Sequence, residues 1–94
     1  MMTITSKRLP WPTNLEQTKL VKDFKFKDFK AAWLFMNKVA IEAENIDHHP
    51  DWSNSYNNVH IELTTHDKGM ITEKDINLAN QIDLIEDKIT SDKK

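Results

Sequence analysis

The spacing of apolar residues changes near residue 28, and this change constrains the fold more than any other feature of the sequence. Residues 20–27 alternate between apolar and polar, whereas residues 28–45 place apolar residues three and four positions apart. The first pattern is typical of a half-buried β-strand and the second of an amphipathic helix. We therefore predict a strand and then a long helix, whose apolar stripe makes the main contribution to the core: Phe29, Ala32, Trp33, Met36, Val39, Ala40 and Ala43.

Within this helix, residues 31–36 are apolar on every side, which a helix with one face on a sheet and the other in water does not need. We expect Leu34 and Phe35 to contact a second subunit of a homodimer or homotetramer. The alternative is that the N-terminal segment of the same chain covers them. Pro10-Trp11-Pro12 holds an aromatic ring in an extended stretch that could lie along a sheet edge, and we expect Trp11 to pack rather than to react.

A hairpin is predicted over residues 52–66, where two alternating runs flank Asn57-Asn58. Asn tolerates a positive φ, so this dipeptide suits a two-residue turn. The resulting register puts both aromatic residues of the first strand on the apolar face and places His49 opposite His66. Its cross-strand pairs are Tyr56 with Val59, Asn54 with Ile61, and Trp52 with Leu63. The opposite face of the second strand is polar and carries His60, Glu62, Thr64 and His66.

A second helix is predicted after Gly69, the only glycine of the chain, which supplies a permissive turn. Thr72-Glu73-Lys74-Asp75 has the pattern of a capping box that opens a helix. The apolar side of this helix is broad and consists of Ile76, Leu78, Ala79, Ile82, Ile85 and Ile89.

The element order strand, strand, helix, strand, strand, helix predicts an α+β two-layer sandwich. A four-stranded antiparallel sheet would carry both helices on one face. The length of 94 residues fits one domain over 1–94. We expect residues 1–9 and 91–94 to be loose.

Composition excludes several classes of function. Thirteen Lys plus Arg against fifteen Asp plus Glu give a formal charge of −2 with the signs interspersed, which gives direct nucleic-acid binding little support. The absence of Cys excludes disulfides and thiolate chemistry. No signal-peptide run and no stretch near the ~20 apolar residues of a membrane span is present. We therefore expect a soluble, cytoplasmic protein without membrane contact.

The stretch Asp47-His48-His49-Pro50-Asp51-Trp52 concentrates the proton chemistry of the chain. Imidazole has an ordinary pKa of about 6.5, which suits it to donate and accept protons near neutral pH. Pro50 biases His49 towards an extended conformation, so the two histidines should lie at a helix-to-strand junction. The alternative is a chance pair of histidines in a polar loop.

A longer pattern of residues at fixed gaps consists of Glu44, His48, His49, Pro50, Tyr56, His66 and Asp75. This pattern resembles that of the pterin-4a-carbinolamine dehydratase family. The similarity extends from about Trp11 to Ile85 and includes the segments 24–29, 57–59, 65–67 and 72–79. One departure is Met70, where family members usually have a second glycine after Gly69, so the conformation of that turn and the placement of Asp75 are open at this point.

The resemblance implies dehydration of 4a-hydroxytetrahydropterin to quinonoid dihydropterin, which recycles the cofactor of aromatic amino acid hydroxylases. It also implies a homo-oligomer without metal or cofactor. His48, His49 and His66 would be the acid, the base and the pterin-contacting group, without an assignment among the three. Candidate pterin-binding residues are Asp47, Pro50, Trp52, Thr64, Thr65 and Asp67. Glu44 and Asp75 would support the histidines.

Each assignment has an ordinary structural alternative. Asp75 can cap the last helix as well as serve the site, and Glu44 can be a solvated helix residue. The hairpin register favours Tyr56 as a core residue, and the two candidate threonines are also common strand residues.

Two other functions compete with the enzyme. Some members of the family resembled serve as dimerisation cofactors for a transcription factor, through the helix that here carries Leu34 and Phe35. A zinc site built from the three histidines and a carboxylate has suitable ligand types. Neighbouring strand residues point to opposite faces, however, which works against His48 and His49 sharing one ion.

Overall fold

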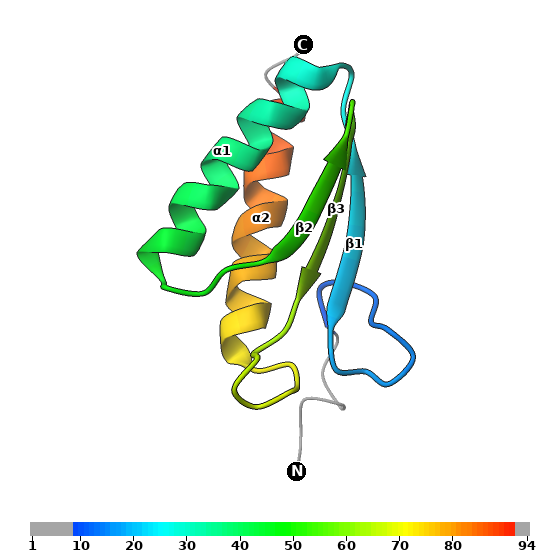
Figure 1. The fold of residues 1–94 in the computed structure, drawn as a ribbon. Helices are drawn as coiled ribbons and strands as arrows, with labels where there is room; N and C mark the ends of the chain where they lie inside the picture. Colours follow the sequence, from blue (N-terminus) through cyan, green and yellow to red (C-terminus); the bar gives the residue numbers. More distant parts are fainter. Residues whose placement is uncertain (1–8, 92–94) are drawn as a thin grey trace.

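The computed structural model describes residues 9–91, which form a three-stranded antiparallel sheet with two helices on one face (Figure 1). The elements are β1 (Leu20–Lys25), α1 (Phe29–Asn45), β2 (Asp51–Ser55), β3 (Asn58–Leu63) and α2 (Glu73–Ser91). The strand order is β1-β3-β2, so β3 lies in the centre of the sheet. The α+β class and the placement of the helices on one face are thus confirmed.

The predicted fourth strand is wrong. The segment before β1 forms only an isolated bridge between Thr13 and Leu20 in the described part of the chain. Pairing stops there because the Asn14 side chain accepts the backbone N–H groups of residues 18 and 19 at 2.8 and 2.9 Å, which folds the segment into a tight turn. Within the segments expected to be loose, Leu9 packs against the core, and residues 1–8 and 92–94 lie outside the described residues.

The segment around Trp11 covers the outer edge of β1 and attaches it to α2. Trp11 is buried, its ring meets the Phe24 ring edge-on with centroids 5.6 Å apart, and its Nε1 donates to Asp83 Oδ1 at 3.0 Å. Lys22 reaches the same Asp83 oxygen at 3.0 Å. The expectation that Trp11 packs is confirmed.

Helix α1 begins where the change of spacing predicts. Asp28 is its N-cap and accepts the Ala31 N–H at 2.9 Å. Its buried face, however, is rotated from the predicted stripe and consists of Ala31, Ala32, Phe35, Val39 and Ala43. Phe29 and Trp33, predicted in the core, are 45% and 51% exposed and stack on each other.

Phe35 sets this rotation. Its ring is fully buried and lies 4.9 and 4.8 Å, centroid to centroid, from Phe24 and Phe26 of the β1 segment. The expectation that Phe35 contacts a second subunit is therefore wrong, because its ring is part of the intramolecular core. Leu34 remains on the outer face, 46% exposed.

The hairpin turn lies at Tyr56-Asn57, one residue before the predicted position. Trp52 therefore pairs with Ile61 rather than Leu63, and Asn54 pairs with Val59 rather than Ile61. A shift of the pairing by two residues leaves every paired side chain of the two strands on its predicted face. Trp52 accordingly packs against the core and Val59, Ile61 and Leu63 are buried beneath the helices, as predicted.

Tyr56 corrects another expectation. It adopts a φ of 53° in the turn and is 64% exposed, so it is not a core residue. Its conformation is stabilised by the Asn54 side-chain amide, which donates to the carbonyls of Tyr56 and Asn58 at 3.0 and 2.8 Å. Asn57 in turn donates to the Phe26 carbonyl at 2.7 Å, which fixes the turn against the end of β1.

Helix α2 confirms the predicted second helix and its apolar side. Leu78, Ala79, Ile82 and Ile89 are buried, and Ile76 and Ile85 pack partly buried against the same core. Among residues 9–91, neither α1 nor α2 combines the length and the apolar composition that crossing a bilayer requires.

Candidate active site

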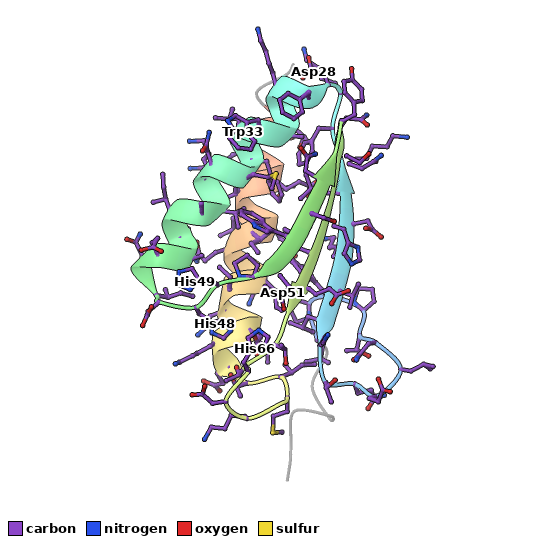
Figure 2. The ribbon with its side chains drawn as sticks, viewed as in Figure 1. Asp28, Trp33, His48, His49, Asp51 and His66 are labelled. Carbon is purple, nitrogen blue, oxygen red and sulfur yellow. The ribbon has the colours of Figure 1, made fainter. Side chains whose placement is uncertain are left out.

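The three candidate histidines lie together at the end of the sandwich where α1 ends, β2 starts and α2 begins (Figure 2). They line a hollow of about 350 Å³, which falls in the size range of small-molecule sites. Within residues 9–91, its lining consists of Asp47, His48, His49, Thr65, His66, Asp67 and Lys74. The structure thus brings together six of the residues singled out from the sequence.

The C-terminus of α1 directs the His-His pair into this hollow. Asp47 takes a φ of 54°, its N–H donates to the Glu44 carbonyl at 3.2 Å, and the His48 N–H donates to the Ala43 carbonyl at 3.0 Å. This is a Schellman motif with an aspartate in the left-handed position. Directly after it the side chains separate, because His48 is 10% exposed and His49 is 55% exposed.

His48 is held by a buried carboxylate. Its Nε2 lies 2.6 Å from Oδ1 of Asp75, which has no exposed surface. The other oxygen, Oδ2, accepts the Thr65 hydroxyl at 2.8 Å and the Thr72 backbone N–H at 3.0 Å. Three donors satisfy a carboxylate that water does not reach. Asp75 therefore caps α2 and also contacts a candidate catalytic histidine, and its supporting role in the site stays a prediction.

The other two histidines are paired more loosely and near the surface. His49 Nε2 lies 2.9 Å from Glu44 Oε2, and His66 Nε2 lies 3.4 Å from Asp51 Oδ2. All four side chains are more than half exposed, so both pairs contribute little to stability. Glu44 nevertheless contacts a histidine, as its supporting role requires.

Sequence reasoning did not assign Asp51 or Lys74 to the site. Asp51 is part of the stretch that contains the two histidines and is the first residue of β2, so its position beside Pro50 was an available signal. Lys74 lies inside the capping box next to Asp75, and the first turn of α2 places it on the rim of the hollow.

The predicted cross-strand pairing of His49 with His66 is wrong. β2 begins at Asp51 and β3 ends at Leu63, so the ladder stops before either histidine. The two residues still line one hollow, because the segment that leads into β2 and the segment that leaves β3 lie at the same end of the sheet (Figure 1).

Three candidate binding residues are not part of the lining. The Thr64 hydroxyl donates to the Thr18 carbonyl at 2.8 Å, Trp52 packs partly buried against the core, and Pro50 joins His49 to β2. Thr65 and Asp67 do line the hollow.

The turn that contains Gly69 forms without a second glycine. Gly69 has a φ of 65°, whereas Met70, within the described residues, does not have a positive φ. Met70 instead pairs with Thr65, whose N–H donates to the Met70 carbonyl at 3.0 Å. The departure at Met70 therefore does not prevent Asp75 from reaching His48.

The fourth histidine, His60, lies on the open face of the sheet and outside this hollow. Its Nδ1 is 2.6 Å from Asp23 Oδ1 and its Nε2 is 2.9 Å from Glu62 Oε2. The hydrogen bonds that His60 donates to Glu62 and then to Asp23 raise the pKa of His60, and the same bond to Glu62 lowers the pKa of Glu62.

The arrangement of the three site histidines suits proton transfer. Each Nε2 is directed at a separate carboxylate, so the rings do not converge on a common point through these nitrogens. Among residues 9–91, no group of three or more His, Asp or Glu side chains is placed to bind a metal ion. Three imidazoles around one hollow can supply both an acid and a base to a ligand bound there.

Comparison with known proteins identifies a family. Residues 3–85 match the family model described as pterin 4 alpha carbinolamine dehydratase. A Rhodospirillum rubrum protein, provisionally named pterin-4-alpha-carbinolamine dehydratase, is 53% identical over 75 residues, which cover 80% of this chain and 78% of that protein. A Prochlorococcus marinus protein with the same provisional name is 56% identical over 69 residues, 73% of each chain.

Solved structures show the same fold. A Brucella melitensis protein described as a transcriptional coactivator/pterin dehydratase superposes with a TM-score of 0.79 at 40% identity, over 82% of both chains. A pterin dehydratase-like protein identified as a RuBisCO assembly factor superposes with a TM-score of 0.70 at 21% identity, over 81% of this chain and 88% of its own. The second likeness concerns the fold alone.

Proposed function

Because this chain belongs to the pterin-4a-carbinolamine dehydratase family, we propose that it dehydrates 4a-hydroxytetrahydropterin to quinonoid dihydropterin. The observation that carries the proposal is the grouping of His48, His49 and His66, each with its own carboxylate, around one hollow. The product would recycle the pterin cofactor of aromatic amino acid hydroxylases.

The reaction needs two proton transfers. An acid protonates the hydroxyl on C4a, the C4a–O bond breaks, and water departs. A base removes the proton from N5, and the C4a–N5 double bond forms. Histidines provide both functions near neutral pH, each for about 10²- to 10⁴-fold in rate. His48 has a fixed orientation against buried Asp75, whereas exposed His49 and His66 can exchange protons with solvent.

The pterin would lie in the hollow among its polar groups. Asp47, Thr65 and Asp67 have positions from which they can contact the ring system, and Lys74 lies on the same rim. We assign Pro50, Trp52 and Thr64 an indirect part, because they lie next to the segments that carry the lining residues, Pro50 and Trp52 after His49 and Thr64 before Thr65.

The decisive experiment is a stopped-flow assay with 4a-hydroxytetrahydropterin generated in situ. The purified chain should accelerate the loss of water, and replacing His48, His49 or His66 with Ala should lower the rate about tenfold or more. A rate equal to the uncatalysed one, from a folded protein, would contradict the proposal.

A second candidate function is a protein-binding module. It is favoured by the apolar side chains on the outer face of α1 and by the description of the Brucella melitensis protein as a coactivator. These outer-face residues are Phe29, Trp33, Leu34 and Ile41. Capture of a helical partner by a variant without the three site histidines would support the module. Loss of dehydration in that variant, with no partner captured, would support the enzyme.

A further inference from the structure

The Thr72 hydroxyl does not cap the helix it precedes. Thr72 is the N-cap of α2, since its carbonyl accepts the Ile76 N–H at 3.2 Å. An N-cap hydroxyl ordinarily accepts an N–H from the first turn. Here the Asp75 N–H donates to the Thr72 carbonyl at 3.0 Å, and the Thr72 hydroxyl instead lies 2.6 Å from the Thr65 hydroxyl. The Thr72 side chain therefore hydrogen-bonds to Thr65 and does not cap the helix.

The direction of the bond between the two hydroxyls follows from counting protons. Thr65 donates to Asp75 Oδ2 at 2.8 Å. A hydroxyl has one proton and can accept through its lone pairs, so the Thr65 oxygen must accept from Thr72. The hydrogen bonds run in one direction, from Thr72 to Thr65 to the carboxylate of Asp75.

The same counting fixes the protonation of His48. An ionised carboxylate only accepts, so the 2.6 Å contact between Asp75 Oδ1 and His48 Nε2 places a proton on Nε2. In the neutral ring Nδ1 is then without a proton. Within residues 9–91 no hydrogen-bond partner is found for Nδ1, and no buried side-chain nitrogen or oxygen is unpaired. Nδ1 is therefore accessible from the hollow that His48 lines.

We infer that Thr72 and Thr65 are positioning residues that hold His48, through Asp75, in its Nε2–H tautomer, so that Nδ1 is the nitrogen that exchanges a proton with the ligand. The catalytic meaning of this inference rests on the proposed function, whereas the tautomer does not. Without the Thr65 proton, Oδ2 keeps only the Thr72 N–H, and the carboxyl group can rotate. A carboxyl group that turns away from Nε2 no longer fixes a proton there, and the neutral His48 ring can then adopt the Nδ1–H tautomer.

The tautomer is tested directly by long-range ¹H–¹⁵N NMR of the full chain, at a pH where the His48 ring is neutral. The wild-type protein should show the Nε2–H pattern. Thr65→Val should shift the population towards Nδ1–H, Thr65→Ser should restore it, and Thr72→Val should cause a smaller shift in the same direction. Thr64→Val is the matched control, because it removes a neighbouring hydroxyl that donates to the Thr18 carbonyl, and it should leave the tautomer unchanged.

Dehydration kinetics supply the second readout. Thr65→Val should lower kcat about tenfold, because it removes one charge-assisted hydrogen bond to Asp75. Thr65→Ser should recover most of the loss. Thr72 is not in the lining of the hollow within residues 9–91, so Thr72→Val should lower kcat by a smaller factor with KM within about twofold. A wild-type Nδ1–H pattern, or a folded Thr65→Val variant with unchanged tautomer and kcat, would overturn the inference.

The outcomes separate the two proposals. If the tautomer responds as expected but the wild-type chain has no dehydratase activity, the proposed reaction fails and the positioning role stands. If the chain is active but the tautomer is insensitive to both threonines, the positioning role fails alone. Should Thr65→Val not fold, the wild-type spectrum and the Thr72→Val variant decide the question.

Discussion

His48 Nε2 lies 2.6 Å from Oδ1 of Asp75, across 27 positions of the chain and in a buried setting. The contact joins the end of α1 to the first turn of α2. Because the same carboxylate also accepts the Thr72 N–H, the geometry of the site and the start of the helix depend on one side chain.

Replacing Asp75 with Ala should therefore lower both stability and activity. Three donors would lose their acceptor inside the protein, which should lower the free energy of unfolding by about 2 to 4 kcal/mol in urea titrations. Asp51→Ala is the matched control, because its contact with His66 is 3.4 Å long and more than half exposed, and it should cost less than about 1 kcal/mol. Equal losses in the free energy of unfolding for the two variants would show that the burial of Asp75 does not determine its contribution to stability.

The position of the site could be predicted from the sequence better than its internal contacts. The change of spacing located α1, and Pro50 after two histidines indicated a junction at the end of that helix. Two roles could be predicted for Asp75 from the sequence, but its distance from His48 could not. That contact depends on how α1 and α2 pack. Asp51 and Lys74 are common polar residues, and only the fold shows that Asp51 contacts His66 and that Lys74 lines the hollow.

The errors on the fold arose where local patterns permitted two answers. Residues 31–36 are apolar on every side, so spacing alone could not select Phe35 over Trp33 as the buried ring. The choice depends on the fit between Phe35 and the two β1-segment rings. In the hairpin, Asn57-Asn58 was the expected turn, but Tyr56 accepts the positive φ because the Asn54 amide stabilises its carbonyl.

The preparation should contain no stoichiometric metal. Each site histidine directs Nε2 at its own carboxylate, an arrangement that leaves no shared position for an ion among these nitrogens. Elemental analysis of protein purified without a histidine tag should give well below one equivalent of zinc. Zinc at one equivalent, together with activity that chelators abolish, would refute this prediction.

The outer face of α1 should mediate assembly into a dimer or tetramer. Trp33 and Leu34 are 51% and 46% exposed, and adjoining apolar side chains of this kind mark interaction surfaces. Light scattering should give at least twice the mass of the chain, and Trp33→Glu or Leu34→Glu should reduce it by introducing a charge into the contact. Lys25→Glu, at an exposed position of β1 outside α1, is the control for charge alone.

If wild-type protein is a monomer at micromolar concentration, this interface does not exist. If Trp33→Glu and Leu34→Glu both stay assembled while remaining folded, the subunits meet through another surface. Urea titration of each variant distinguishes loss of assembly from loss of fold.

His60 should affect the pH dependence of stability but not the reaction. Its hydrogen bonds with Glu62 and Asp23 raise its pKa in the folded protein, so the charged ring is favoured by folding. This stabilisation is complete below the ordinary pKa of about 6.5 and is lost as the pH rises through the raised value. The ring is 39% exposed, so solvent and salt screen the effect.

His60→Gln should remove this fall in stability between neutral and mildly alkaline pH, measured as the free energy of unfolding at several pH values in low salt. The same variant should dehydrate the pterin within about twofold of the wild-type rate, because His60 lies on the open face of the sheet with Asp23 and Glu62 and does not line the hollow. His66→Ala provides the contrast, with an expected loss of about tenfold or more. A His60→Gln variant that folds but loses as much activity as His66→Ala would show that the reaction takes place on the open face of the sheet and not in the hollow.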